Sequence, residues 1–301
     1  MTDAASSSVT STAARDAFDR LLEQLRPKLH RYCARMTGSV IDGEDVLQEA
    51  LVKAIEAFGA GAPIQNPEGW LFRIAHNAAL DFLRGRARAN SHFGEGDPDM
   101  MVDTVNPVED REIVAASLHS FMRLPAAQRS SVILMDVLGY SLDQIGEITA
   151  TTVPGIKAAL HRGRARLREL AAAPDERPLP QLGARERALL SAYVDRFNAS
   201  DVDGFRKLLA EDVRLEVVTR FRRSGTTDVG TYISRYAASN DWRLVPGLVE
   251  GRPAALVIDP ADASGTPNYF VLIDFSAGHV ANIMDFRYAR YVMDGAETVV
   301  L

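Results

Sequence analysis

The residues with the clearest chemical potential are cations that recur at helical spacing near the middle of the chain. In a helix over residues 153–168, side chains three or four positions apart share a face, so a basic stripe runs beside an apolar one. Such cations hold phosphate oxygens by charge and hydrogen bonding. Thr151, Thr152 and Lys157, at the start of the helix, are expected to approach base edges. The expected phosphate contacts are His161, Arg162, Arg164 and Arg166.

A second polar face is predicted on a helix over residues 67–88. Its members are spaced by four, four, three and four residues, which places them on one side of the helix. Arginine binds phosphate, and asparagine and aspartate can read base edges. A face of this kind is also commonly just solvated, so both interpretations stay open at this point. The face comprises Arg73, Asn77, Asp81, Arg84 and Arg88.

Acidic residues gather at the start of a predicted helix over residues 42–58. Asp42 is expected to cap this helix, and Glu44, Asp45, Gln48 and Glu49 are expected to form an outward face. Negative charge in a first turn is stabilised by the helix dipole, so capping alone would account for these residues. The functional interpretation is a docking face for a basic partner.

Two short helices and a tight turn are expected to position the basic stripe. Ser141 and Gln144 form a capping-box pattern at the start of the first helix. Thr152 is a good N-cap for the second, and Pro154 lies in its first turn, where a missing N–H costs nothing. The pair has the form of a helix-turn-helix, whose second helix enters a major groove. A basic helix packed in a bundle is the alternative.

Composition limits the remaining function classes. The chain has 301 residues and a net charge of −6, which argues against a uniformly basic nucleic-acid binder and makes any DNA contact local. Cys33 is the single cysteine, so there is no internal disulfide and no cysteine-rich zinc site, which fits a reducing cytoplasm. We expect no metal, no cofactor and no membrane span. Residues 1–14 are small and polar and are expected to be disordered.

Two segments together resemble a known family. DGEDVLQEALVKA, followed by NPEGWLFRIAHNAALDFLRGRAR, resembles region 2 of bacterial sigma-70 family factors of the extracytoplasmic-function group. LPAAQRSSVILMDVLGYSLDQIGEITATTVPGIKAALHRGRARLRE resembles region 4 of the same group. The resemblance implies region 2 over 15–90, an acidic linker over 91–111 and a region 4 helix-turn-helix over 112–172, both regions being all-α.

The resemblance also implies partners and roles. Asp45, Gln48 and Glu49 match the part of region 2 that docks on the clamp helices of the RNA polymerase largest subunit, and region 4 is expected at the flap. The polar face of the 67–88 helix matches the side that meets the −10 element. The helix-turn-helix matches the part that reads the −35 element of promoter DNA.

The last third of the chain changes character. A proline-rich linker over 173–182 precedes residues 183–301, which resemble the SnoaL-like branch of the cone-shaped, α+β NTF2-like fold. Asp274, His279, Asp285 and Arg287 lie in strand-like runs and could face a cavity or simply pair with neighbours. We expect no catalytic residues here. The tail is instead expected to regulate by contacting the sigma regions or polymerase, with a small-molecule ligand left open.

These patterns predict a sigma factor that brings RNA polymerase core to promoters and starts transcription. The alternative is a stand-alone helix-turn-helix regulator whose tail senses a small molecule. A third interpretation makes the tail an enzyme fused to a regulator. The acidic helix at residues 42–49 discriminates between them, because a simple regulator needs no polymerase-docking face.

Overall fold

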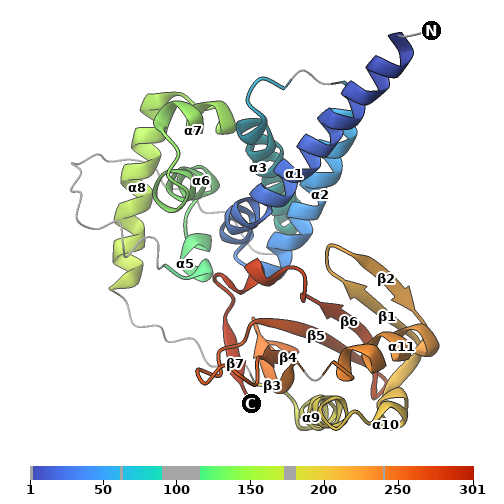
Figure 1. The fold of residues 1–301 in the computed structure, drawn as a ribbon. Helices are drawn as coiled ribbons and strands as arrows, with labels where there is room; N and C mark the ends of the chain where they lie inside the picture. Colours follow the sequence, from blue (N-terminus) through green and yellow to red (C-terminus); the bar gives the residue numbers. More distant parts are fainter. Residues whose placement is uncertain (1–2, 62–63, 90–115, 173–180, 240) are drawn as a thin grey trace. The chain divides into compact units, whose positions relative to one another are not determined.

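The computed structural model describes residues 3–61, 64–89, 116–172, 181–239 and 241–301, with side chains from residue 13 onward (Figure 1). The chain divides into an N-terminal unit, Met1–Asp175, and a C-terminal unit, Glu176–Leu301. The predicted acidic linker at 91–111 lies outside the described residues, and so does most of the proline-rich linker at 173–182.

Three helices form the first half of the N-terminal unit: α1 (Asp3–Thr37), α2 (Val40–Gly59) and α3 (Pro67–Ala89). They pack pairwise around large buried side chains, among them Tyr32 and Phe72. Asn66 caps the start of α3, and its side chain accepts a hydrogen bond from the Gly69 N–H at 3.1 Å.

Two helix starts differ from the expectations drawn from sequence. The hydroxyl of Ser39, not the carboxylate of Asp42, caps α2, because it accepts the N–H groups of Ile41 and Asp42 at 3.2 and 3.1 Å. The helix therefore begins earlier, and Asp42 lies in its first turn. Residues 3–14, expected to be disordered, form the start of α1. Several of them are alanine, the strongest helix former.

The second half of the N-terminal unit contains α5 (Leu118–Met122), α6 (Ala126–Val132), the π-helix η2 (Ile133–Val137), α7 (Leu142–Thr149) and α8 (Val153–Ala171). The capping box of Ser141 and Gln144 is confirmed. So is Thr152, whose hydroxyl accepts the Gly155 N–H at 3.4 Å. Between the two helices, Ala150 adopts φ 54°, the left-handed conformation that turns the chain out of α7.

The two halves of the N-terminal unit pack directly on each other, although the sequence predicts separate modules. Arg129 is 5% exposed, and its Nη1 donates to the Met36 carbonyl at the end of α1 over 2.5 Å. The Tyr140 hydroxyl donates a hydrogen bond to Glu68 at the start of α3 over 2.5 Å. The rings of Tyr140 and Phe72 pack edge to face, with their centres 5.1 Å apart. Helices α3 and α7 consequently lie side by side, as Figure 1 shows.

Buried His76 makes the stability of this unit depend on pH. Burial lowers the pKa of His76 to about 4, the charge of Arg84 acts in the same direction, and the Tyr32 hydroxyl lies 2.7 Å from Nδ1. The unfolded chain takes up this proton near pH 6.5, whereas the folded chain does not. Stability is therefore complete above pH 6.5 and falls by about 3 kcal/mol as the pH drops toward 4.

Urea unfolding of full-length protein at pH 7, 6 and 5, followed by circular dichroism, measures this loss. His76→Gln keeps an acceptor for Tyr32 but does not titrate, so we expect its stability to vary less over this range. The control is His119→Gln, because His119 is exposed. An equally steep decline in the His76→Gln protein would show that other groups cause it.

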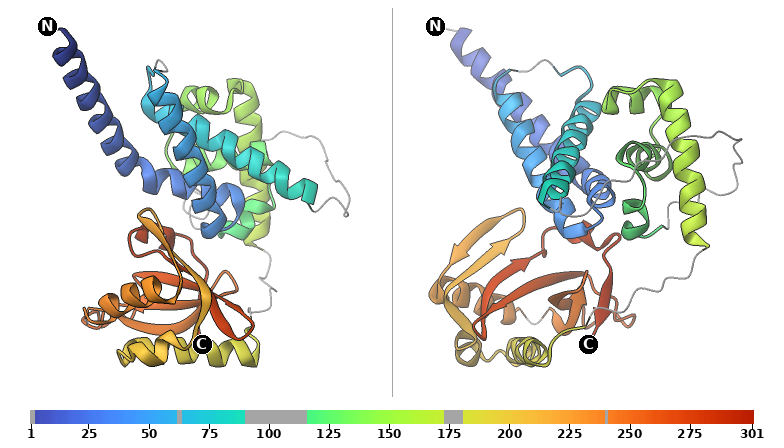
Figure 2. Two further views of the ribbon diagram at one scale, coloured as in Figure 1. Left: turned by 90° about the vertical axis from the view of Figure 1, so that its right-hand side faces the viewer. Right: turned by 180° about the vertical axis from the view of Figure 1, so that it is seen from behind.

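The C-terminal unit contains one seven-stranded sheet in the order β2-β1-β6-β5-β4-β3-β7. Strands β1 and β6 run parallel and the other neighbours antiparallel. Figure 2 shows that the sheet is curved. The strands are β1 (Leu209–Val217), β2 (Phe221–Ser224), β3 (Arg243–Val249), β4 (Arg252–Ile258), β5 (Tyr269–Ser276), β6 (His279–Asp285) and β7 (Thr298–Val300).

Helices α9 (Ala184–Asn198), α10 (Val202–Arg206) and α11 (Thr226–Ala237) pack with the sheet around a common core. A short 3-10 helix, η3 (Arg290–Met293), follows β6. In β1, Val213, Leu215 and Val217 are buried and alternate with more exposed residues, as the period of two of a half-buried strand requires. The expected α+β architecture of residues 183–301 is confirmed.

Candidate nucleic-acid and polymerase interface

The polar face predicted on α3 is an exposed surface of that helix. Its arginines, asparagine and aspartate are all exposed, while Leu71, Ala75 and Ala78 on the other side are buried. Asp81 and Arg84 form an exposed ion pair at 2.6 Å. Arg73 and Asn77 have no hydrogen bond or ion pair within the described residues. Helix packing thus leaves their polar groups available to a ligand.

The basic stripe of α8 divides into exposed and structural members. Thr151, Thr152 and Lys157 are exposed at the start of the helix, although the Thr152 hydroxyl is already used as the cap. His161 and Arg162 are half-buried, and Arg166 is exposed and pairs with Glu169 at 2.7 Å. The buried side of the helix is formed by Ile156, Leu160, Gly163 and Leu167, as the apolar spacing predicts.

Arg164 has a partner that the sequence does not reveal. Its Nε donates to Asp136 in η2 over 2.9 Å, and Nη2 donates to the other carboxylate oxygen. The Asp136 side chain is 2% exposed and that of Arg164 is 19% exposed. A bidentate, largely buried pair ties α8 to η2. Arg164 therefore has a role in folding, and its removal would leave a buried carboxylate unpaired.

The acidic face of α2 is smaller than expected. Asp45 and Glu49 are exposed, and Gln48 is half-buried. Glu44, expected outward, is 3% exposed because it accepts hydrogen bonds from Arg26 at 3.0 Å and Gln48 at 2.6 Å. The outward acidic face therefore consists of Asp45 and Glu49. The neighbouring Gln48 side chain is fixed by the hydrogen bond that it donates to Glu44.

Of the four tail residues that could face a cavity or pair with neighbours, only Asp285 and Arg287 contact each other among the described residues. Asp285 is buried and accepts the Tyr232 hydroxyl at 2.7 Å and the Arg287 N–H at 2.8 Å. Asp274 instead binds Arg252 at 3.0 Å and Asn282 at 3.1 Å, and His279 is exposed at the start of β6. Because no second carboxylate of the described residues joins Asp285, the arrangement they form provides no pair of carboxylates with split pKa values.

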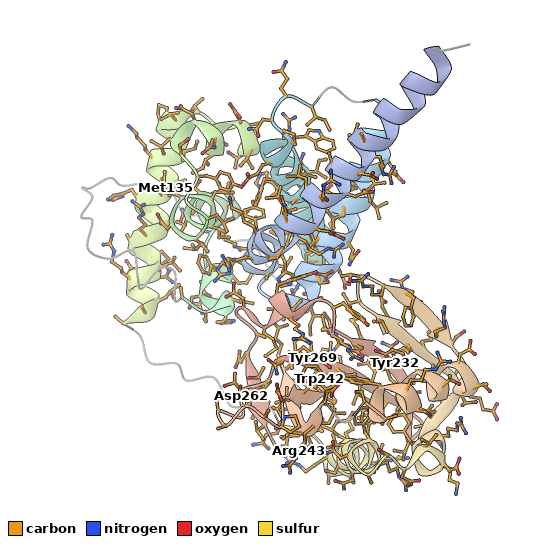
Figure 3. All side chains as sticks on the ribbon, viewed as in Figure 1. Met135, Tyr232, Trp242, Arg243, Asp262 and Tyr269 are labelled. Atoms are coloured by element: carbon orange, nitrogen blue, oxygen red, sulfur yellow. The ribbon has the colours of Figure 1, made fainter. Side chains whose placement is uncertain are left out.

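Asp285 lies instead among aromatic side chains. Burial raises its pKa, and the hydrogen bonds from Tyr232 and Arg287 oppose that rise. The hydroxyls of Tyr236 and Tyr269 are hydrogen-bonded, and the Trp242 ring meets Tyr269 edge-on at 5.5 Å. Figure 3 labels Tyr232, Trp242 and Tyr269, which come from α11, the segment before β3, and β5. This is a packed polar core in which the hydroxyls of Tyr232, Tyr236 and Tyr269 are hydrogen-bonded, whereas the buried Trp242 Nε1 has no hydrogen-bond partner among the described residues.

Sequence reasoning missed two groups of residues. One is the tyrosine cluster around Asp285, whose members are far apart in the chain. The other consists of Arg220, just before β2, and Arg222 and Arg223 on β2, which the local clustering of charge in the sequence could have revealed.

Among the described residues, no group of histidine, cysteine, aspartate and glutamate side chains has the proximity needed to hold a metal ion. None of the described helices combines the length and apolar character needed to cross a bilayer.

Comparison with known proteins identifies both halves of the N-terminal unit. The model of sigma-70 region 2 matches residues 21–89, and that of sigma-70 region 4 matches residues 118–167. The ECF RNA polymerase sigma factor SigM of Mycobacterium tuberculosis is 34% identical over 160 residues, which cover 52% of this chain and 78% of SigM.

The similarity to another factor extends into the tail. SigG, an ECF RNA polymerase sigma factor of Mycobacterium tuberculosis, is 27% identical over 302 residues, covering 90% of this chain and 81% of SigG. The crystal structure of the ECF sigma factor SigJ from the same organism aligns over 88% of this chain and 94% of that one, with 21% identity and a TM-score of 0.35. By these matches to both regions and to SigM, the chain belongs to the extracytoplasmic-function RNA polymerase sigma factors.

Proposed function

We propose that the exposed faces of α2, α3 and α8 are the three working surfaces of this sigma factor. Asp45 and Glu49 on α2 meet the basic clamp helices of polymerase core. The α3 face meets the −10 element. At the −35 element Lys157 of α8 approaches base edges, and Arg162 and Arg166 hold phosphates. The observation that carries the proposal is that Arg73 and Asn77 stay exposed and without a polar partner among the described residues.

Promoter binding at both elements requires the two halves of the N-terminal unit to separate. Elements centred roughly 25 base pairs apart lie about 85 Å from each other along straight DNA at 3.4 Å per pair. In the structure α3 packs against α7, which is joined to α8 by a turn of a few residues. Polymerase binding therefore has to break the contacts of Arg129 and Tyr140 with region 2.

Phosphate contact by α8 is tested by the salt dependence of promoter binding. Arg162→Gln with Arg166→Gln, in holoenzyme, is expected to weaken binding and to reduce the slope of log affinity against log salt by about 2, since each phosphate contact contributes about 0.9. Fluorescence anisotropy over a salt series measures both quantities. Arg164 is left intact because of its pair with buried Asp136.

The control for this test is Arg123→Gln, because Arg123 is exposed beside α5 and has no ion pair among the described residues. It should leave the slope unchanged. Equal slopes for the double variant and the wild-type holoenzyme would rule out phosphate contact by these two arginines.

We further propose that the tail regulates and does not catalyse. The support is that the tyrosine hydroxyls around Asp285 are hydrogen-bonded to one another or to Asp285, and that no second carboxylate joins Asp285 within the part of the chain that the structure describes. The proposed surfaces of regulation are the sigma regions or polymerase, in the cytoplasm where polymerase and promoter meet.

A further inference from the structure

The β1–β2 hairpin of the C-terminal unit carries an unexplained concentration of arginines. An open hollow of about 500 Å³ lies against its strands and β6. Arg214 of β1 lies in register with Ser224 of β2 on one side and Asn282 of β6 on the other. The hollow is lined by Arg214, Leu215, Glu216, Arg222, Arg223, Ser224 and Asn282.

The charges of this hollow do not cancel. Glu216 is the single carboxylate among the lining residues, and it already accepts a hydrogen bond from Arg222 at 2.9 Å. Arg214 and Arg223 have no ion pair within the described part of the chain. Three guanidinium groups against one carboxylate leave a local positive charge on a chain whose net charge is −6. A bound anion would relieve the mutual repulsion.

Exposed aromatic rings accompany the arginines. Phe221 is 36% exposed and Tyr288 is 49% exposed. The guanidinium of Arg223 lies 4.8 Å from the centre of the Phe221 ring, and that of Arg220 lies 4.8 Å from the centre of the Tyr288 ring. Each guanidinium therefore lies over one face of its ring, and the exposed remainder of the ring is a surface on which an unpaired base can stack while arginines hold the phosphates.

We propose that this hairpin surface, formed by Arg214, Arg220, Phe221, Arg222, Arg223 and Tyr288, binds a nucleic-acid strand of the promoter complex. The hollow takes phosphate groups, and Phe221 and Tyr288 offer stacking faces to bases. An acidic peptide would use the arginines alone, whereas the exposed rings favour nucleic acid. The proposal uses the chain's membership of the sigma factors and adds a DNA contact outside regions 2 and 4.

The test uses holoenzyme containing the full-length chain. Arg214→Gln with Arg223→Gln removes two positive charges and leaves the Arg222–Glu216 pair intact. We expect promoter affinity to fall five- to twentyfold and the salt slope to fall by about 1 to 2. The matched control is Arg235→Gln with Arg243→Gln, since both are exposed without an ion pair among the described residues. Equal thermal unfolding confirms that the variants fold.

Two DNA probes distinguish the forms of the contact. One is fully duplex promoter, and the other carries an unpaired bubble at the −10 element. If the arginine variant loses affinity only for the bubble probe, and Phe221→Leu loses affinity for that probe as well, the surface contacts a single strand. If the arginine variant loses affinity equally for both probes, the surface contacts phosphates of duplex DNA.

Two results would overturn the proposal. The first is promoter binding by the hairpin variant that matches that of the control. The second is unchanged DNA affinity combined with weaker polymerase binding, which would assign the surface to a protein partner. Failure of wild-type holoenzyme to bind promoter would instead contradict the proposed function itself.

Discussion

Arg129→Met is expected to lower the free energy of unfolding of the N-terminal unit by about 3 to 5 kcal/mol, because a hydrogen bond that involves a charged group contributes about 1.5 to 3 kcal/mol and several are lost. The guanidinium donates to three backbone carbonyls: Met36 at 2.5 Å, Met122 at 3.3 Å and Leu124 at 2.8 Å. Burial lowers the pKa of Arg129 to about 10, so the group remains charged at neutral pH. Methionine fills similar space without donating hydrogen bonds.

The same change should loosen the contact between regions 2 and 4. Met36 lies near the end of α1, whereas Met122 and Leu124 belong to the region 4 half. Close packing reinforces the junction, because a Cβ at Gly38 would lie 2.2 Å from the Met122 side chain. We therefore expect faster hydrogen exchange at the end of α1 and in α6 than in the wild-type protein.

Urea unfolding and hydrogen exchange by mass spectrometry check these effects. Arg123→Met is the control, because Arg123 is exposed and its substitution should change stability by less than about 0.5 kcal/mol. If Arg129→Met and Arg123→Met unfold at the same urea concentration, the carbonyl contacts contribute nothing to stability.

Asp45→Lys with Glu49→Lys is expected to weaken binding to polymerase core by about 10- to 100-fold, since like charges facing each other cost several kcal/mol. Both side chains are exposed, and Glu49 gives up only a surface pair with Lys53 at 2.7 Å. Buried Glu44, which organises Gln48, is untouched. The fold should therefore survive while the docking surface changes sign.

Competition for core against a labelled sigma factor, at two salt concentrations, measures this affinity. Asp195→Lys with Asp228→Lys makes the same change in charge on exposed positions of α9 and α11 and serves as the control. If both variants lose the same affinity for core, the loss reflects total charge, and Asp45 and Glu49 are not the polymerase-docking face.

Hydrogen exchange of free protein and holoenzyme also tests the required separation of the two regions. If polymerase pulls region 4 away from region 2, the end of α1 should lose protection in the complex even in the wild-type chain. Retained protection would place both regions on polymerase in their packed arrangement.

Features that depend on near neighbours in the chain could be predicted from the sequence. Ser141, Asn66 and Thr152 cap helices through groups within three residues, so their roles follow from local spacing. The exposed face of α3 and the alternation of β1 follow from helical and strand periods. These local rules, with the resemblance to regions 2 and 4, determined the family and the candidate DNA-binding faces.

Tertiary structure decided which charged residues remain available to a partner. Asp136 lies 28 positions from Arg164, and Arg26 lies 18 positions from Glu44, so spacing alone could not show that both pairs are internal. The contact of Arg129 with Met36 spans 93 positions and joins two regions that sequence reasoning kept apart. Burying a charge is costly unless a partner is brought to it, and packing across the whole unit determines which partner arrives.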